Sequence, residues 1–119
     1  MTNSFKELEE ADCILVFGSN TTVAHPVASN HLFCAKEKGA KLVVIDPRET
    51  QMAERADLHL QITPGTDVAL INSLLHLIYK NGWHNQSFIE ERTEDCESLL
   101  QTIKHYPPQR AAELCNIPV

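Results

Sequence analysis

Three short polar segments contain the residues whose types and spacing could do chemistry. Each follows an apolar run that is typical of a strand: Gly18-Ser19-Asn20-Thr21-Thr22, Asp46-Pro47-Arg48 and Pro64-Gly65-Thr66-Asp67. In an open parallel sheet, ligands bind just beyond the carboxyl ends of the strands, so these segments are the candidate site. Small residues let backbone amides approach an anion, a carboxylate can accept from a ribose or a base edge, and an arginine can meet a phosphate or stack on a base. These residue types suit a nucleotide.

Each segment also has a purely structural interpretation. The first can be a tight strand-to-helix connection, and it lacks the GxGxxG pattern of an ordinary Rossmann NAD site. Asp46 and Arg48 can cap the following helix and form a surface ion pair, and Thr66 or Asp67 can be a helix N-cap. Spacing alone does not separate these roles.

The histidines and cysteines do not have the spacing of a metal site. No HxxxH, HxH or CxxC pair occurs among the six histidines and four cysteines. We expect Cys13, Cys34, Cys96 and Cys115 to be ordinary buried or half-buried thiols. His25 stands at an expected helix start beside the candidate site, where a ring hydrogen bond would brace the loop. We expect a brace there and not a catalyst.

Composition excludes two broad classes of function. The chain has 119 residues, enough for one domain with a modest core. Its formal net charge is −6 and its ten basic residues are scattered, which argues against binding to DNA or RNA through phosphates. No apolar run approaches the ~20 residues that span a bilayer, and no basic-then-apolar leader opens the chain. The default expectation is therefore a cytoplasmic protein.

The pattern of apolar residues predicts an α/β fold, a Rossmann-like three-layer βαβ core with a short parallel sheet and a small helical C-terminal extension. Strands are expected at residues 13–17, 41–45 and 58–62, and helices at 4–10, 26–38, 49–55 and 67–80. The first strand should be buried on both faces. Val27, Leu32, Phe33 and Ala35 should pack the second helix, and Val68, Leu70 and Ile71 begin the apolar face of the fourth. Shorter helices are expected at 85–91, 94–103 and 111–114, so that residues 1–83 form the α/β segment and 84–119 its helical extension.

The three segments, in this order, resemble those of the molybdopterin oxidoreductases of the dimethyl sulfoxide reductase family, and within it the formate dehydrogenase large (alpha) subunits. The matching stretches are ADCILVFGSNTTVAHPV, GAKLVVIDPRET, AERADLHLQITPGTDVALINSLLHLI and FIEERTE. They cover nearly the whole chain, which therefore resembles an internal fragment of such a subunit. Asp95-Cys96 departs from the Gly-Phe that commonly follows Arg-Thr-Glu in the family.

The resemblance implies that this segment is one of two halves that hold the two molybdopterin guanine dinucleotides flanking a molybdenum or tungsten ion. Gly18, Ser19 and Asn20, with Thr22 nearby, would line the phosphates of one cofactor. Asp46, Pro47 and Arg48 would meet its guanosine, and Gly65, Thr66 and Asp67 would close around the guanine. His25, with Pro26, matches the family's helix start.

For the parent protein the resemblance implies oxidation of formate to carbon dioxide and electron transfer to a 4Fe-4S cluster that lies outside this chain. The expected partners are the remaining domains of the large subunit and electron-transfer subunits. No catalytic or metal-ligating residue is expected here, and the fragment alone should be inactive. Three alternatives remain open: the same segment of a nitrate reductase-type enzyme, a stand-alone nucleotide-binding module such as the central domain of thiamine-diphosphate enzymes, and a folded remnant that binds nothing.

Overall fold

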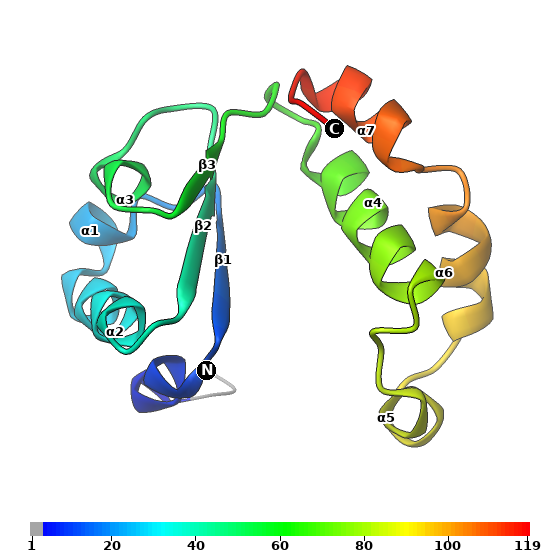
Figure 1. Cartoon of the computed structure of the whole chain (residues 1–119), viewed down its shortest axis with the longest axis horizontal. Helices are drawn as coiled ribbons and strands as arrows, with labels where there is room; N and C mark the ends of the chain where they lie inside the picture. The colour runs from blue at the N-terminus through cyan, green and yellow to red at the C-terminus, as the bar shows by residue number, and fades with distance from the viewer. Residues whose placement is uncertain (1–3) are drawn as a thin grey trace. The chain divides into compact units, whose positions relative to one another are not determined.

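The computed structural model describes residues 4–119, which divide into two compact units at Ile62 and Thr63. The first unit contains the sheet, and the described part of the second contains helices α4 to α7 and no strand. This division assigns α4 to the helical unit, whereas the sequence-based boundary at residue 83 assigned it to the α/β segment. The α/β class, the parallel sheet and the helical C-terminal part are confirmed (Figure 1).

The sheet of the first unit consists of three parallel strands in the order β1-β2-β3. These strands are β1 (Cys13–Phe17), β2 (Lys41–Ile45) and β3 (Leu58–Leu60). β1 and β2 pair along their whole length, from Cys13 opposite Lys41 to Phe17 opposite Ile45. Their bounds are those that the β-branched and apolar runs predict, and β3 is two residues shorter than predicted.

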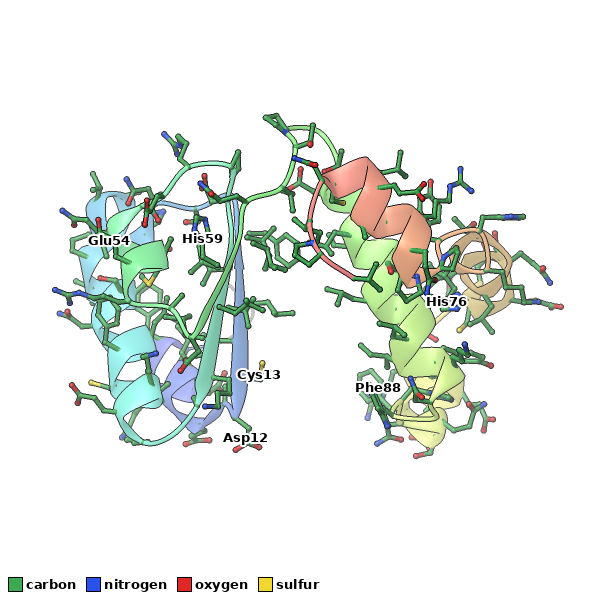
Figure 2. All side chains as sticks on the ribbon, turned by 45° about the horizontal axis from the view of Figure 1, so that its top comes forward. Asp12, Cys13, Glu54, His59, His76 and Phe88 are labelled. Carbon is green, nitrogen blue, oxygen red and sulfur yellow. The ribbon has the colours of Figure 1, made fainter. Side chains whose placement is uncertain are left out.

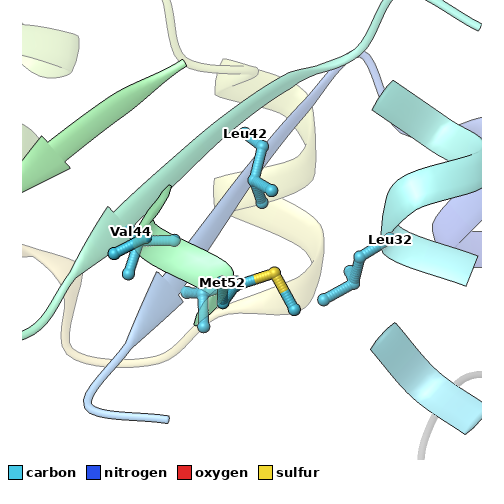
Figure 3. Packing of buried hydrophobic residues seen from close by; sticks show 6 residues of the cluster. Leu32, Leu42, Val44 and Met52 are labelled. Carbon is cyan, nitrogen blue, oxygen red and sulfur yellow. The ribbon is translucent and has the colours of Figure 1, made fainter. Parts of the chain in front are cut away.

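The helices of the first unit cover one face of this sheet (Figure 1). They are η1 (Phe5–Glu10), a 3-10 helix, and the α-helices α1 (Thr21–Ala24), α2 (Pro26–Glu37) and α3 (Gln51–Glu54). Between them and the sheet lies a core cluster of buried side chains: Val16, Leu32, Leu42, Val44, Met52 and Ala53 (Figure 3). The first unit by itself thus contains two of the three layers that the sequence predicts.

Burial corrects several expectations for the first unit. β1 is not buried on both faces, because Cys13 is exposed and Leu15 is 50% exposed. Val27, expected in the packing face of α2, is 61% exposed, whereas Leu32 and Ala35 of the same helix are buried. An apolar run marks a strand but does not show which face its neighbours cover.

Asp57, just before β3, ties the amino ends of two strands and a helix together. Its carboxylate accepts the backbone N–H of Leu42 at 2.9 Å and lies 2.8 Å from the ammonium of Lys36. The Leu42 N–H, followed by Lys36, holds the pKa of Asp57 below its ordinary value. A similar pair of contacts ties η1 to α2, where Glu9 binds His31 at 2.6 Å and Lys38 at 2.7 Å.

The second unit is built around α4 (Asp67–Lys80), which contacts both α6 (Cys96–Ile103) and α7 (Pro108–Cys115). The remaining helix is α5 (Gln86–Arg92). α7 is longer than predicted because it begins at Pro108. A proline fits the first turn of a helix, since the N–H that it lacks would have no partner within the helix there. Val68 and Ile71, predicted to pack α4, are exposed, while Leu70 is buried. No helix among residues 4–119 has the length and apolarity needed to cross a membrane.

Replacing Leu42 or Leu15 by alanine tests which face of the sheet is packed. Leu42→Ala should lower the free energy of unfolding by about 3 kcal/mol, since it removes a fully buried side chain. Leu15→Ala should cost less than about half as much, because Leu15 is 50% exposed on the opposite face. Urea unfolding followed by circular dichroism measures both values. Equal losses would show that the two faces are covered alike.

Asp57→Asn should make the free energy of unfolding depend less on pH in the acidic range. Because the folded pKa of Asp57 is lowered, its contribution is complete above the ordinary aspartate pKa of about 4 and is lost as the pH falls through the lower folded value. The wild-type chain should therefore lose more stability below about pH 4 than the variant. Asp12→Asn, at an exposed carboxyl on the same side of the sheet, is the control and should leave the profile unchanged. Parallel profiles for wild type and Asp57→Asn would contradict the assignment.

Candidate functional site

The carboxyl ends of β1 and β2 bring the first two polar segments together. The backbone N–H of Gly18 donates to the carbonyl of Ile45 at 2.8 Å, one residue before Asp46. The N–H of Asp46 in turn donates to the carbonyl of Leu60 at the end of β3, at 3.2 Å. The loop after β1 and the loop after β2 therefore share one edge of the sheet, as the sequence predicts.

The loop after β1 presents open backbone donors. Gly18 has φ +54°, a left-handed conformation that bends the chain away from the sheet at little steric cost. The hydroxyls of Ser19 and Thr21 lie 3.0 Å apart, and Thr22 donates to Asn20 Oδ1 at 3.0 Å, so these side chains fix the loop on itself. Within the described part of the chain, no acceptor is found for the amides of Ser19 and Asn20.

The short helix α1 directly after this loop was not predicted from the sequence. It runs from Thr21 to Ala24, has Asn20 as its N-cap residue and is separated from α2 only by His25. Four residues are too few for an apolar periodicity, so only the Asn20 and Thr22 side chains could have indicated it. The segment read as a loop is thus a turn followed by one turn of helix.

Asp46 is a buried carboxylate with one engaged oxygen. The residue is 1% exposed, and its Oδ1 accepts the backbone N–H of Arg48 at 2.8 Å. The exposed guanidinium of Arg48 places its Nε 3.5 Å from the same oxygen, which is the ion pair that the structural interpretation expects. No partner for Oδ2 is found among the described residues. Thr50, and not Asp46, caps α3, because its side chain accepts the N–H of Ala53.

The side chains of His59 and Gln61 form hydrogen bonds to the backbone of the segment after β2. His59 Nε2 lies 2.9 Å from the carbonyl of Asp46, and since a carbonyl only accepts, Nε2 has the proton (Figure 2). Gln61 donates to the carbonyl of Pro47 at 3.4 Å. The sequence did not predict either residue as part of the site. The one pattern that could have indicated them is their spacing of two residues along β3 and the residues after it, which places both side chains on the same face of the strand.

His25 does not act as the expected brace. Its side chain is exposed, and its ring makes no hydrogen bond within the described residues. Its backbone carbonyl accepts the N–H of Ser29, so the residue ends α1 and begins α2 through the main chain. A ring role toward a ligand stays a prediction.

The third segment belongs to the second unit. Gly65 has φ +86°, and the hydroxyl of Thr66 donates to the carbonyl of Thr63 at 2.7 Å. Thr66 is the N-cap residue of α4 without a capping side-chain bond, and Asp67 is in the first turn, where a carboxylate is favourable. That Gly65, Thr66 and Asp67 close around the same ligand as the first two segments stays a prediction.

A metal site is not found in the described residues. They contain no group of three or more histidine, cysteine, aspartate or glutamate side chains able to hold an ion. The four cysteines are free: Cys13 is exposed, contrary to expectation, Cys34 and Cys96 are partly buried and Cys115 is buried. The donor set of the first unit, with open amides, a buried carboxylate and an exposed guanidinium, fits a phosphorylated nucleoside.

Comparison with known proteins gives consistent results. A family model described as molybdopterin oxidoreductase matches residues 1–108. The chain is 48% identical over 117 residues to the F420-dependent formate dehydrogenase subunit alpha of Methanocaldococcus jannaschii, covering 98% of this chain and 17% of that protein. It is 40% identical over 115 residues to a nitrate reductase of Synechocystis sp., covering 95% and 16%. The acetylene hydratase from Pelobacter acetylenicus is a solved structure with TM-score 0.82 and 32% identity, covering 91% of this chain and 15% of that one.

Gly18→Ala tests the left-handed turn at the start of the loop. A Cβ at this position would meet no atom within 4 Å, so the effect should come from the backbone alone. At φ +54° we expect a loss of about 1 kcal/mol in the free energy of unfolding. Gly18→Asn should lose less, because asparagine tolerates this conformation better. Urea unfolding of both variants measures the difference, and a neutral Gly18→Ala would mean that the turn relaxes.

Proposed function

Because the chain belongs to the molybdopterin oxidoreductase family, we propose that its first unit binds the guanosine diphosphate part of a molybdopterin guanine dinucleotide. The observation that carries this proposal is the juxtaposition of the Gly18 loop and Asp46 at one edge of the sheet, fixed by the 2.8 Å bond from Gly18 to Ile45. This is the edge at which parallel sheets bind nucleotides.

Each group at this edge has a role that suits a nucleotide diphosphate. The open amides of Ser19 and Asn20 donate to phosphate oxygens, with Gly18 allowing close approach and Thr22 holding the loop. Asp46 Oδ2 accepts from the guanosine, and the Asp46–Arg48 turn leaves the exposed guanidinium beside it for a phosphate or the base. Pro47 fixes the backbone between them.

The burial of Asp46 makes its carboxylate the most selective group. Asp46 is 1% exposed, so a hydrogen bond from a ligand to its Oδ2 would form in a poorly hydrated surrounding, where it is stronger than at an exposed oxygen. A guanine edge or a ribose offers paired N–H or O–H donors. In our proposal, Gly65, Thr66 and Asp67 of the second unit complete the contact with the guanine, and His25 lies at the margin of the cofactor.

For the whole protein we propose a formate dehydrogenase catalytic subunit, of which this chain anchors one cofactor. The chain spans 17% of the length of the formate dehydrogenase relative, so the reaction, the iron–sulfur cluster and the electron-transfer subunits all concern the parent protein. The molybdenum or tungsten ion of the bound cofactor supplies the redox chemistry. This chain contributes binding and orientation. The nitrate reductase relative favours a second candidate, the same anchor in an enzyme that reduces nitrate.

Titration of the labelled chain with GDP and with ADP tests the proposal. Backbone amide shifts should be confined to residues 18–22, 46–48 and 65–67 and should be stronger for GDP. Asp46→Asn should weaken GDP binding about tenfold, since it removes a charged acceptor while keeping the oxygen that binds the Arg48 N–H.

Asp12→Asn is the matched control for this experiment. Asp12 precedes β1, at the opposite edge of the sheet from Asp46, and the substitution removes the same charge (Figure 2). GDP affinity should be unchanged in this variant. Equal responses to GDP and ADP that Asp46→Asn leaves unaltered would contradict the proposal.

A further inference from the structure

A concave site lies within the helical unit, in a groove of about 470 Å³ between α4 and α6. Its volume is in the range of ligand pockets. The lining residues recur at helical spacing on both helices: His76, Tyr79 and Lys80 on α4, and Glu97, Leu100, Gln101, Ile103 and Lys104 on or directly after α6. None of them belongs to the segments proposed for the nucleotide.

The floor and walls of this groove are apolar and fixed. Ile103 is buried and Leu100 is partly buried. His76 Nδ1 lies 3.0 Å from the carbonyl of Ile103, which holds the imidazole ring against α6 (Figure 2). The Tyr79 ring is stacked on His84 with centroids 4.5 Å apart. A flat or aliphatic group can therefore bind without prior rearrangement.

One end of the groove has donors without an opposing charge. Lys104 Nζ donates to Gln101 Oε1 at 3.4 Å, which leaves the amide N–H groups of Gln101 as further donors. No ion pair of Lys104 or Lys80 is found among residues 4–119. The second unit contains seven acidic side chains and only four basic ones, Lys80, Arg92, Lys104 and Arg110, so half of its basic side chains line this groove.

The acidic residue of the groove lies at its other end. Glu97 precedes Lys104 by seven residues, which separates them by about 10 Å along α6. α4 and α6 run in opposite directions, so the end of α4, which carries Lys80, lies beside the start of α6, which carries Glu97 (Figure 1). An anion is therefore favoured at the Lys104 end.

We propose that this groove binds a small amphipathic carboxylate. The apolar body of the ligand lies against Leu100, Ile103 and the Tyr79 ring, and its carboxylate accepts from Lys104 and the Gln101 amide. The proposal is independent of the nucleotide site, because it rests on different residues in the other unit.

A matched pair of ligands separates the apolar and the charged contributions. The 119-residue labelled chain is titrated with 4-phenylbutanoate and with 4-phenylbutanol, which share one carbon skeleton. The acid should shift the amides of Leu100, Gln101 and Lys104 at millimolar concentration and bind more tightly than the alcohol. Lys104→Met should weaken binding of the acid roughly two- to fivefold, as expected for the loss of an exposed ion pair. Binding of the alcohol should be unaffected.

Lys6→Met, at an exposed lysine of η1, is the control and should change neither affinity. Leu100→Ala should weaken both ligands alike, because it shortens the apolar floor. Absence of shifts in the groove, equal binding of acid and alcohol, or a Lys104→Met variant that binds the acid normally would each overturn the proposal. Equal binding would instead point to an apolar surface for another polypeptide.

Discussion

The parallel pairing of β1 with β2 is the constraint on which the candidate site depends. Five consecutive residues of each strand are in register, and the ladder ends with the bond from the Gly18 N–H to the Ile45 carbonyl. Because parallel strands end at the same edge, the loop that follows each strand is delivered to the same place whatever its own sequence. The core beneath, with Leu42 and Val44 against Leu32 and Met52, maintains that register by fixing which face of β2 is buried.

Two aspartates show how position along this sheet separates a structural carboxylate from a binding one. Asp57, at the amino end of β3, binds the Leu42 N–H and Lys36 through Oδ2, with Lys41 Nζ 3.9 Å from Oδ1, and these contacts hold elements of the fold together. Asp46, at the carboxyl end of β2, is more deeply buried, yet only one of its oxygens is engaged by its own chain. In the proposed site the free Oδ2 of Asp46 is the acceptor offered to the nucleotide, whereas the contacts of Asp57 all join elements of the fold.

The sequence predicted the elements of the first unit better than their surroundings. β1, β2 and α2 follow from apolar runs with clear stops at Gly18, Gly39 and Asp46-Pro47, because local conformational preference alone marks these elements and their ends. The sequence did not predict that Cys13 and Leu15 are exposed, because a run of apolar residues is compatible with a strand that is covered on one face or on both. His59 escaped notice because its role depends on β3 lying beside β2, a contact between residues far apart in sequence. α1 was not predicted because its four residues are too few to show the apolar periodicity of a helix.

We propose that the nucleotide binds at the carboxyl edge of the sheet and not at another surface. The most direct measurement is a set of intermolecular nuclear Overhauser effects between bound GDP and the amide protons of the chain. Binding at the carboxyl edge should give contacts from ribose and guanine protons to residues 46–48 and from ribose H5′ protons to residues 18–20. Contacts to Asp12, Lys41 or Asp57, at the amino edge of the same sheet, would contradict it.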